Sequence, residues 1–494
     1  MPGGGKSDRI GAEILKGECF VLRIMLGKAG TGKTGLIMSE IARAVAEKRG
    51  GSVLIVPEQY SHEAERELCA VCGDSASLYA EVLSFTGLCR MAERELGGAG
   101  QSWLDKGGRL LCMAVALDGL YSRLTLYPQA RRRTELQSAL LGAVDELKTA
   151  CISPEQLMEA SKQCDGVLAD KLRDLALISE GFDAVVANGH ADPTDRLTRL
   201  AGRLENSGFG RGLRIYFDGF TDFTAQERRI INALLTNGAE LCVCLGCDGL
   251  DGSSEIFALP RLTARRLISF AAEKGIESSV ELIGGRGRGT GLLSYFADNM
   301  FTYSSASYGN GEGELRVVRA ADMEQECEFA AAEACRLVRE TGCRRRDIAV
   351  AVRGFEDYRL PLTAAFAHYG VPLYSARRSE LTERSLPALI SAAYEIVTGG
   401  WELDDVTDYM RTGLTGLSLD ECDELEDYAY VWQLRGSAWY RPEDWAQHTE
   451  PELTDEIKER LRRVNELRRR LTAPLVRFDA ATRSAETATG QARA

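Results

Sequence analysis

The sequence lacks any long apolar stretch. No run of about 18 or more apolar residues, the length typical of a transmembrane helix, occurs in the 494 residues. The first residues, MPGGGKSDRIGAEILKGECF, also lack the apolar centre of a signal peptide. We therefore expect a cytoplasmic protein with no membrane contact.

Positive charge and histidine are also scarce. The chain has 60 Lys and Arg against 73 Asp and Glu, a net charge of −13, and only 4 His. This balance argues against a protein that is surrounded by nucleic acid, but a local basic groove remains compatible with it, because binding depends on where charge lies. The histidines are isolated in the sequence, so no histidine-based triad or metal site is expected.

Complete sets of metal-binding cysteines are missing, although cysteine itself is plentiful. The 14 cysteines include two closely spaced pairs, Cys69 with Cys72 and Cys244 with Cys247. Zinc and iron–sulfur sites need fuller ligand sets, so a metal site would require these distant pairs to meet. We favour the alternative that the cysteines are packing residues.

Hydrophobic patterns divide the chain into α/β and helical regions. Apolar runs such as CFVLRIML and SVLIVPEQ alternate with amphipathic helices, as in a parallel sheet with right-handed crossovers. A long stretch then shows only helical periodicity, before the α/β pattern returns at LRIYFDGF. We expect a first core in residues 1–95 and 211–305, a helical insertion in 96–210, the start of a second core in 306–400 and a helical extension in 401–494.

The strongest motif is GKAGTGKT, which matches G-x-x-x-x-G-K-[ST] in full and lies between a predicted strand and a predicted helix. Its glycines allow backbone N–H groups to surround phosphates. Lys33 is placed to reach the β- and γ-phosphates, and the Thr34 hydroxyl to bind magnesium. The motif predicts an ATP-binding P-loop made of Gly27, Lys28, Ala29, Gly30, Thr31, Gly32, Lys33 and Thr34.

Asp218 is the candidate for the second magnesium-binding group. It ends the apolar run LRIYFD, which predicts a later strand of the same sheet. Together with Thr34 it would hold Mg²⁺ beside the phosphates. The alternative is an aspartate that only caps the turn after the strand.

The order of these segments resembles the first core of UvrD-type superfamily-1 helicases. The forms VPEQ, VLSFTGLCR and DGFTDFTAQE resemble the AddB family more narrowly, and the resemblance covers residues 19 to 480. It implies a P-loop NTPase fold of two RecA-like parallel-sheet cores with helical insertions. It also implies an AddA-type motor and nuclease subunit as heterodimer partner. Single-stranded DNA and duplex ends would be bound, in the processing of double-strand breaks for homologous recombination.

Two positions depart from the helicase pattern. UvrD-type helicases place a glutamate directly after the aspartate and a glutamine two residues further on, but here these positions are Gly219 and Thr221. The glutamate polarises the attacking water and the glutamine senses the γ-phosphate, so we expect ATP binding with weak or no hydrolysis. No catalytic residue is assigned. Arg353 is a candidate for the nucleotide cleft or, alternatively, a solvated charge at a strand end.

Tyr60, Phe85 and Thr86 are the candidate DNA contacts, since they follow strand ends where such contacts form in relatives. The alternative for Phe85 is that it packs under the following helix.

AddB-like proteins are roughly twice as long as this chain, and their nuclease domain and iron–sulfur cluster belong to a later region. The chain shows no nuclease constellation of carboxylates and lysine. We therefore expect the nuclease and the cluster only in a C-terminal half that this sequence does not contain. Two alternatives stay open: an active DNA-stimulated helicase that uses Glu227 or Asp222 as its base, and a non-enzymatic scaffold with a vestigial P-loop.

Overall fold

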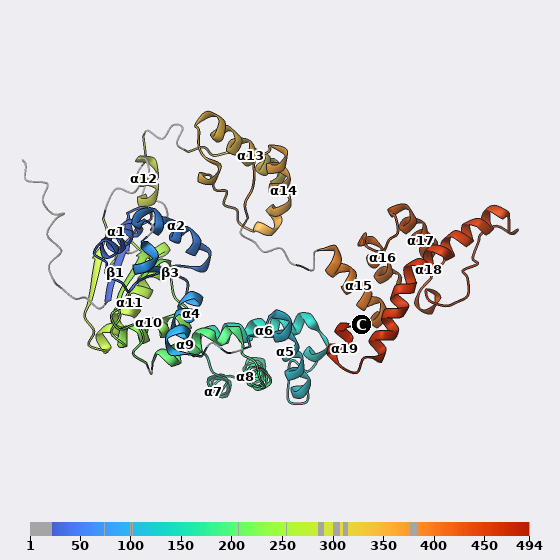
Figure 1. The fold of residues 1–494 in the computed structure, drawn as a ribbon, viewed down its shortest axis with the longest axis horizontal. Coiled ribbons are helices and arrows are strands. Elements are labelled where there is room, and N and C mark those ends of the chain that lie inside the picture. The colour runs from blue at the N-terminus through green and yellow to red at the C-terminus, as the bar shows by residue number, and fades with distance from the viewer. Residues whose placement is uncertain are drawn as a thin grey trace, which may run out of the picture. The chain divides into compact units, whose positions relative to one another are not determined.

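The computed structural model describes residues 22–73, 75–98, 100, 102–205, 207–252, 254–284, 291–299, 307–309, 315–375, 381 and 384–493. The chain divides into two compact units, Met1–Arg316 and Val317–Ala494. Figure 1 labels the elements of both units. Among the helices of the described ranges, none is long and apolar enough to cross a bilayer.

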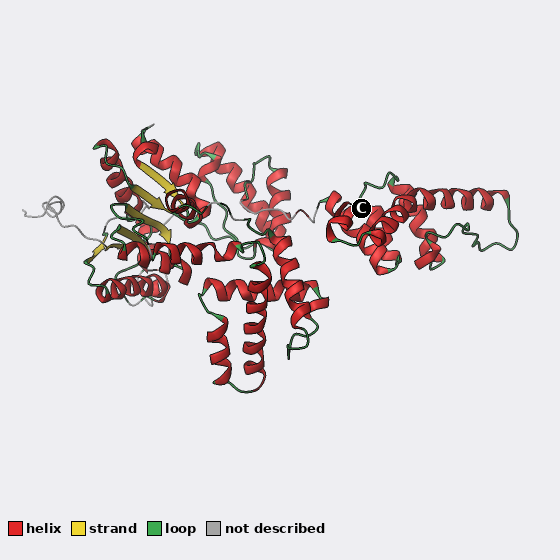
Figure 2. Cartoon of the chain, turned by 60° about the horizontal axis from the view of Figure 1, so that its bottom comes forward, coloured by secondary structure: helices red, strands yellow, loops and turns green. Residues whose placement is uncertain are grey.

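The first unit contains a six-stranded sheet in which all neighbouring strands are parallel, in the order β3-β2-β4-β5-β1-β6. Figure 2 shows these strands gathered in one sheet among the helices. The strands are β1 (Leu22–Gly27), β2 (Ser52–Ile55), β3 (Ala80–Leu83), β4 (Arg214–Phe220), β5 (Glu240–Gly246) and β6 (Ser278–Leu282). The predicted α/β fold with a parallel sheet is confirmed.

Helices cover both faces of this sheet because successive strand residues point to opposite sides. In β1, Ile24 and Leu26 belong to the larger core cluster with α4, α9, α10 and α11, whereas Met25 packs with α1, α2 and α3. The covering helices are α1 (Lys33–Ala46), α2 (Ser61–Cys72), α3 (Ala76–Tyr79), α4 (Phe85–Leu96), α9 (Arg196–Leu204), α10 (Ala225–Thr236) and α11 (Ala258–Glu273). Short 3-10 helices lie at η1 (Glu58–Tyr60) and η4 (Glu255–Phe257).

A helical region lies between α4 and β4, where the sequence predicts an insertion. It consists of α5 (Lys106–Leu120), η2 (Ala130–Arg132), α6 (Thr134–Thr149), α7 (Pro154–Lys162), α8 (Gly166–Val186) and η3 (Pro193–Asp195), and α9 follows it. Asp174 of α8 is fully buried, and its carboxylate accepts backbone N–H bonds from Thr125, Leu126 and Tyr127. The turn before η2 is thereby fixed to α8, because a buried carboxylate needs such donors.

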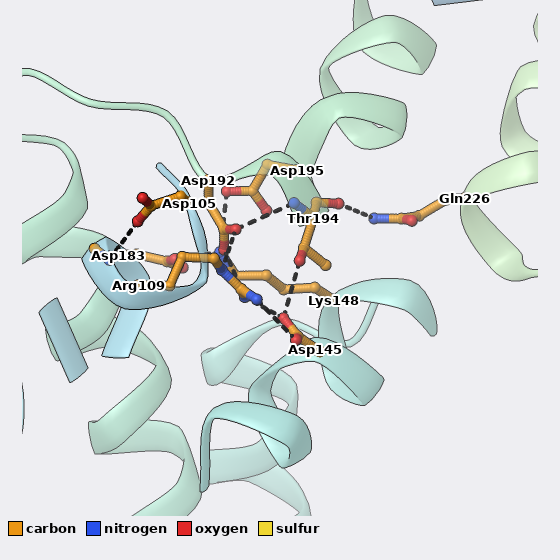
Figure 3. A network of polar contacts seen from close by, with 10 residues as sticks. Asp105, Arg109, Asp145, Lys148, Asp183, Asp192, Thr194, Asp195 and Gln226 are labelled. Carbon is orange, nitrogen blue, oxygen red and sulfur yellow. Dashed lines mark hydrogen bonds and ion pairs between the residues drawn. The ribbon is translucent and has the colours of Figure 1, made fainter. Parts of the chain in front are cut away.

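A network of polar contacts connects this helical region to the core (Figure 3). The ammonium group of Lys148 lies 2.8 Å from Asp192 and 2.9 Å from Asp195. Burial alone would lower the pKa of Lys148, but hydrogen bonds to the surrounding aspartates raise it. Gln226, in the first turn of α10, donates to the carbonyl oxygen of Thr194 at 3.0 Å. The helix that follows the Asp218 strand is therefore hydrogen-bonded to the insertion.

The regular elements that the structure describes in the second unit are helices, joined by loops. These are α13 (Met323–Glu340), η5 (Arg345–Asp347), α14 (Phe355–His368), α15 (Ser385–Gly399), α16 (Leu403–Arg411), α17 (Leu419–Val431), η7 (Gly436–Ala438), α18 (Asp455–Ser484) and α19 (Ala488–Arg493). The runs LRVVRAAD, DIAVAVR and VPLYS, which the sequence predicts as strands of a second core, form no strand here. A strand requires a hydrogen-bonded neighbour, so the second RecA-like core stays a prediction.

The last helices of this unit are held together by matched charges and buried aromatic rings. Acidic α17 faces basic α18, with Arg463 lying 2.8 Å from Glu424. Trp439 and Trp445 are buried in the same cluster, and the side-chain oxygen of Asn465 in α18 accepts the backbone N–H of Trp445 at 2.7 Å. These tryptophans are core residues.

Candidate nucleotide-binding site

The loop between β1 and α1 has the backbone that its glycines predict. Gly30 and Gly32 have φ angles of 76° and 93°, in the left-handed region that favours glycine. A Cβ atom on Gly27 would lie 2.6 Å from the Thr31 hydroxyl oxygen. Glycine is therefore required at all three positions of this loop, whose last residue, Gly32, is the N-cap of α1.

Lys33 folds back over its own loop. Its ammonium group donates to the carbonyl oxygens of Gly27 at 2.6 Å and Lys28 at 2.9 Å. Burial lowers the pKa of Lys33, although the nearby Cys244 and Asp218 act in the opposite direction. The loop therefore surrounds a half-buried cation, which suits it to an anionic ligand.

Thr34 and Asp218 meet at the carboxyl edge of the sheet. The Thr34 hydroxyl donates to a carboxylate oxygen of Asp218 at 2.6 Å, although the residues are 184 positions apart. Strand β5 lies between β1, which leads into the P-loop, and β4, which carries Asp218. Oxygen ligands of this kind suit Mg²⁺, so these two side chains could hold the ion that the P-loop implies.

The backbone directly after Asp218 forms a bulge that was not predicted from the sequence. Phe217 pairs with Val243 and Phe220 with Leu245, so two β4 residues lie opposite one β5 residue. Gly219, inside this bulge, has a φ angle of 82°, and a Cβ there would lie 3.2 Å from Cδ of Pro57. The position where helicases have a glutamate is thus shaped for glycine. A glycine inside an apolar strand was the available signal.

The two alternative bases are engaged in local structure. Glu227 accepts the backbone N–H of Thr224 at 2.8 Å in the capping box of α10. Asp222 accepts a hydrogen bond from the Thr263 hydroxyl at 2.6 Å. Both carboxylates therefore have structural partners.

A further helix, α12 (Gly291–Asn299), contacts the P-loop. The ammonium group of Lys28 lies 2.7 Å from the carboxylate of Asp298. The two lysines of the loop therefore differ, because Lys28 points to a protein carboxylate and Lys33 to the interior of the loop.

The three candidate DNA contacts have different environments. Tyr60 is 50% exposed and Thr86 is half-buried. Phe85 is only 6% exposed, and its ring packs against Phe217, Phe220 and Phe223 with centroid distances of 5.9, 5.7 and 6.3 Å. The Phe85 side chain is therefore a core residue and is not available for base stacking, which corrects the prediction for this position. Tyr60 and Thr86 remain predicted contacts.

The remaining candidates are Arg353 and the closely spaced cysteines. Arg353 is exposed and belongs to the second unit, so its role in a nucleotide cleft stays a prediction. Within the described ranges, no group of three or more His, Cys, Asp or Glu residues could hold a metal ion. Cys244 and Cys247 are buried as expected, whereas Cys69 is exposed.

Comparison with known proteins identifies the family. The family model described as "ADDB, N-terminal" matches residues 24–291, from the P-loop strand to the start of α12. The chain belongs to the AddB family. It is similar to an ATP-dependent helicase/deoxyribonuclease subunit from Desulforudis audaxviator, with 33% identity over 95% of this chain and 42% of the relative.

A second AddB relative, the corresponding helicase/deoxyribonuclease subunit from Acetivibrio thermocellus, is 31% identical over 92% of this chain and 41% of its own length. The chain thus spans about two fifths of the length of these curated relatives. The expected resemblance to the AddB family is confirmed.

Proposed function

We propose that this chain is the ATP-binding part of an AddB-type subunit, which acts with an AddA-type motor and nuclease partner on double-strand DNA breaks for homologous recombination. The names of its relatives, which describe them as subunits of an ATP-dependent helicase/deoxyribonuclease, support this assignment. In this chain ATP and Mg²⁺ would be bound with little or no hydrolysis. A nuclease and an iron–sulfur cluster remain predictions for sequence outside this chain.

The observation that carries the proposal is the hydrogen bond between Thr34 and Asp218, because it brings together the two side chains that would hold Mg²⁺. Lys33 would exchange the two carbonyl oxygens that it now contacts for phosphate oxygens. A bound Mg²⁺ would supply neutralisation of phosphate charge. The backbone N–H groups at the start of α1 would orient the phosphates.

The weak hydrolysis follows from the strand end that faces this loop. Gly219 has no side chain to activate water, and the nearby carboxylates of Asp222 and Glu227 already have structural partners. Absence of a positioned general base typically reduces the rate by a factor of about 10² to 10⁴. The site then favours retention of ATP over turnover.

The proposal is tested by measuring ATP binding and phosphate release together, in Mg²⁺ and single-stranded DNA. Tight binding with negligible release supports it. Rapid DNA-stimulated release would support the first alternative, an active helicase. Failure to bind both ATP and DNA would support the second, a scaffold with a vestigial P-loop.

A further inference from the structure

A second site with the character of an anion pocket lies between α4 and α9, away from the P-loop motif. The cavity has a volume of about 300 Å³, and Trp103, Glu93 and three arginines line it. Arg196, Arg199 and Arg203 come from α9, at spacings that place side chains on one face of a helix. We call this cavity the Trp103 pocket.

The net charge of the residues that line the Trp103 pocket has the opposite sign to the net charge of the whole chain. Three arginines and one glutamate, Glu93, are the ionised residues that line the cavity, a net charge of +2, whereas the chain carries −13. Like charges gathered around one cavity repel one another. An anion in the cavity would relieve this repulsion.

The geometry of Arg196 adds an independent indication. Its guanidinium lies over the Trp103 ring, 4.4 Å from the centroid, and that of Arg199 lies 5.9 Å from the same ring. A guanidinium stacked on an aromatic face keeps its in-plane N–H groups available for phosphate. In the described part of the chain, Nε of Arg196 is buried without a hydrogen-bond partner. The indole therefore fixes the orientation of the Arg196 guanidinium beside the cavity.

Arg203 has a different role. It donates to the carbonyl oxygen of Gly97, the C-cap residue of α4. A Cβ on Gly98 would lie 3.0 Å from its guanidinium. Arg203 thus holds the wall of the pocket, and Arg196 and Arg199 are the candidate ligand contacts.

We propose that the Trp103 pocket binds a phosphate group, and that its source is the backbone of single-stranded nucleic acid. A cavity of this size lies at the lower end of the range for ligand sites, so it suits one nucleotide unit of a strand. Arg196 and Arg199 would each contact a phosphate oxygen. This site is additional to the proposed ATP site and does not depend on Lys33.

The test uses the position of the tryptophans. Trp103 belongs to the first unit, whereas the other four, Trp401, Trp432, Trp439 and Trp445, belong to the second. Titration of the intact chain with a single-stranded oligonucleotide should quench fluorescence, and the change should disappear in Trp103→Phe. In the double variant Arg196→Gln with Arg199→Gln, affinity should fall at least tenfold.

Salt dependence separates a phosphate contact from a structural role. Each phosphate contact to a single strand contributes about 0.7 to the slope of log K against log salt, so loss of two contacts should reduce the slope by about 1.4. The matched control is Arg131→Gln with Arg132→Gln, which removes the same charge from η2 of the insertion. It should leave both affinity and quenching unchanged, as should Lys33→Ala. Unfolding midpoints confirm that each variant is folded.

Two outcomes would overturn parts of the proposal. If affinity and salt slope are unchanged in the folded double variant, the Trp103 pocket does not bind the oligonucleotide. Quenching by pyrophosphate but not by the oligonucleotide would retain the phosphate chemistry and reject nucleic acid as its source.

Discussion

The two sides of the nucleotide site differ in how they are built. On the P-loop side, Gly30 and Gly32 have left-handed backbone, Lys33 donates to carbonyl oxygens of its own loop, and Thr34 donates to Asp218. On the facing strand, Asp218 is in place, but the next residue lies in a bulge shaped for glycine. In the function proposed above, binding and hydrolysis would depend on these two different elements of the fold, so one could be retained while the other is absent.

The largest effect should come from the binding side. Lys33→Ala should weaken ATP binding about 100-fold, because a charged hydrogen bond to phosphate is lost and about 2.7 kcal/mol corresponds to that factor. Lys28→Ala is the matched control on the same loop. Since Lys28 is paired with Asp298, it should change affinity by no more than a few-fold. If both variants lose ATP affinity equally, the different roles given to Lys33 and Lys28 are wrong.

The next effect tests whether the strand end can be repaired. Gly219→Glu introduces the glutamate that UvrD-type helicases have at this position. It should not raise ATP turnover, because the bulge and the positive φ at this residue do not direct a side chain as a regular strand does. Strain at a positive φ should lower the free energy of unfolding by about 1 to 2 kcal/mol.

Gly238→Ala and Gly219→Ala form the control pair for that strain. Both glycines have positive φ, but only at Gly219 would a Cβ contact another residue, Pro57. Denaturant unfolding should therefore show a larger loss at Gly219. Robust turnover by the glutamate variant would contradict the role given to the bulge.

A smaller effect concerns the metal. Asp218→Asn keeps a hydrogen-bond partner for Thr34 but removes the charge that would attract Mg²⁺. ATP affinity in Mg²⁺ should fall about tenfold, about 1.4 kcal/mol, whereas affinity in EDTA should stay unchanged. If the wild type and the variant lose affinity equally on removal of Mg²⁺, Asp218 has no part in metal binding.

The smallest effect concerns the stability of the chain without nucleotide. Burial lowers the pKa of Lys33 in the folded state, so its charge opposes folding at neutral pH. Lys33→Met should therefore raise the unfolding midpoint slightly, while it weakens ATP binding about as much as Lys33→Ala does. The gain should shrink as pH rises through the lowered pKa towards 10.5, the value of a free lysine. A lower midpoint for the variant at pH 7 would contradict this account.

The sequence predicts this site well where the information is local. The eight P-loop residues specify their own turn and apolar runs specify parallel strands, so the sequence predicts that Lys33, Thr34 and Asp218 lie near one another; Thr34 and Asp218 do meet. The bulge at Gly219 depends on pairing with β5, which no local pattern encodes. Phe85 follows a strand end, as a DNA contact would, but its ring packs against three phenylalanines that lie far from it in the sequence.

In the second unit, too, local sequence patterns do not determine which segments pair as strands. Its apolar runs have strand propensity, but a strand forms only beside a hydrogen-bonded neighbour. In the described residues these runs form no strand, and the regular elements of the unit are the helices between and after them. By contrast, the packing role of Trp439 and Trp445 follows from a helical cluster that is complete within the unit.

The most direct test of the central claim is the fate of bound ATP in a single turnover. ATP labelled at the γ-phosphate would be bound with Mg²⁺, mixed with single-stranded DNA and unlabelled ATP, and quenched at intervals. The account predicts that the bound label is recovered as intact ATP, and that the recovered fraction is the same in the wild type and in Gly219→Glu. The account would be contradicted if the wild type converts the bound label to free phosphate and Lys33→Ala does not.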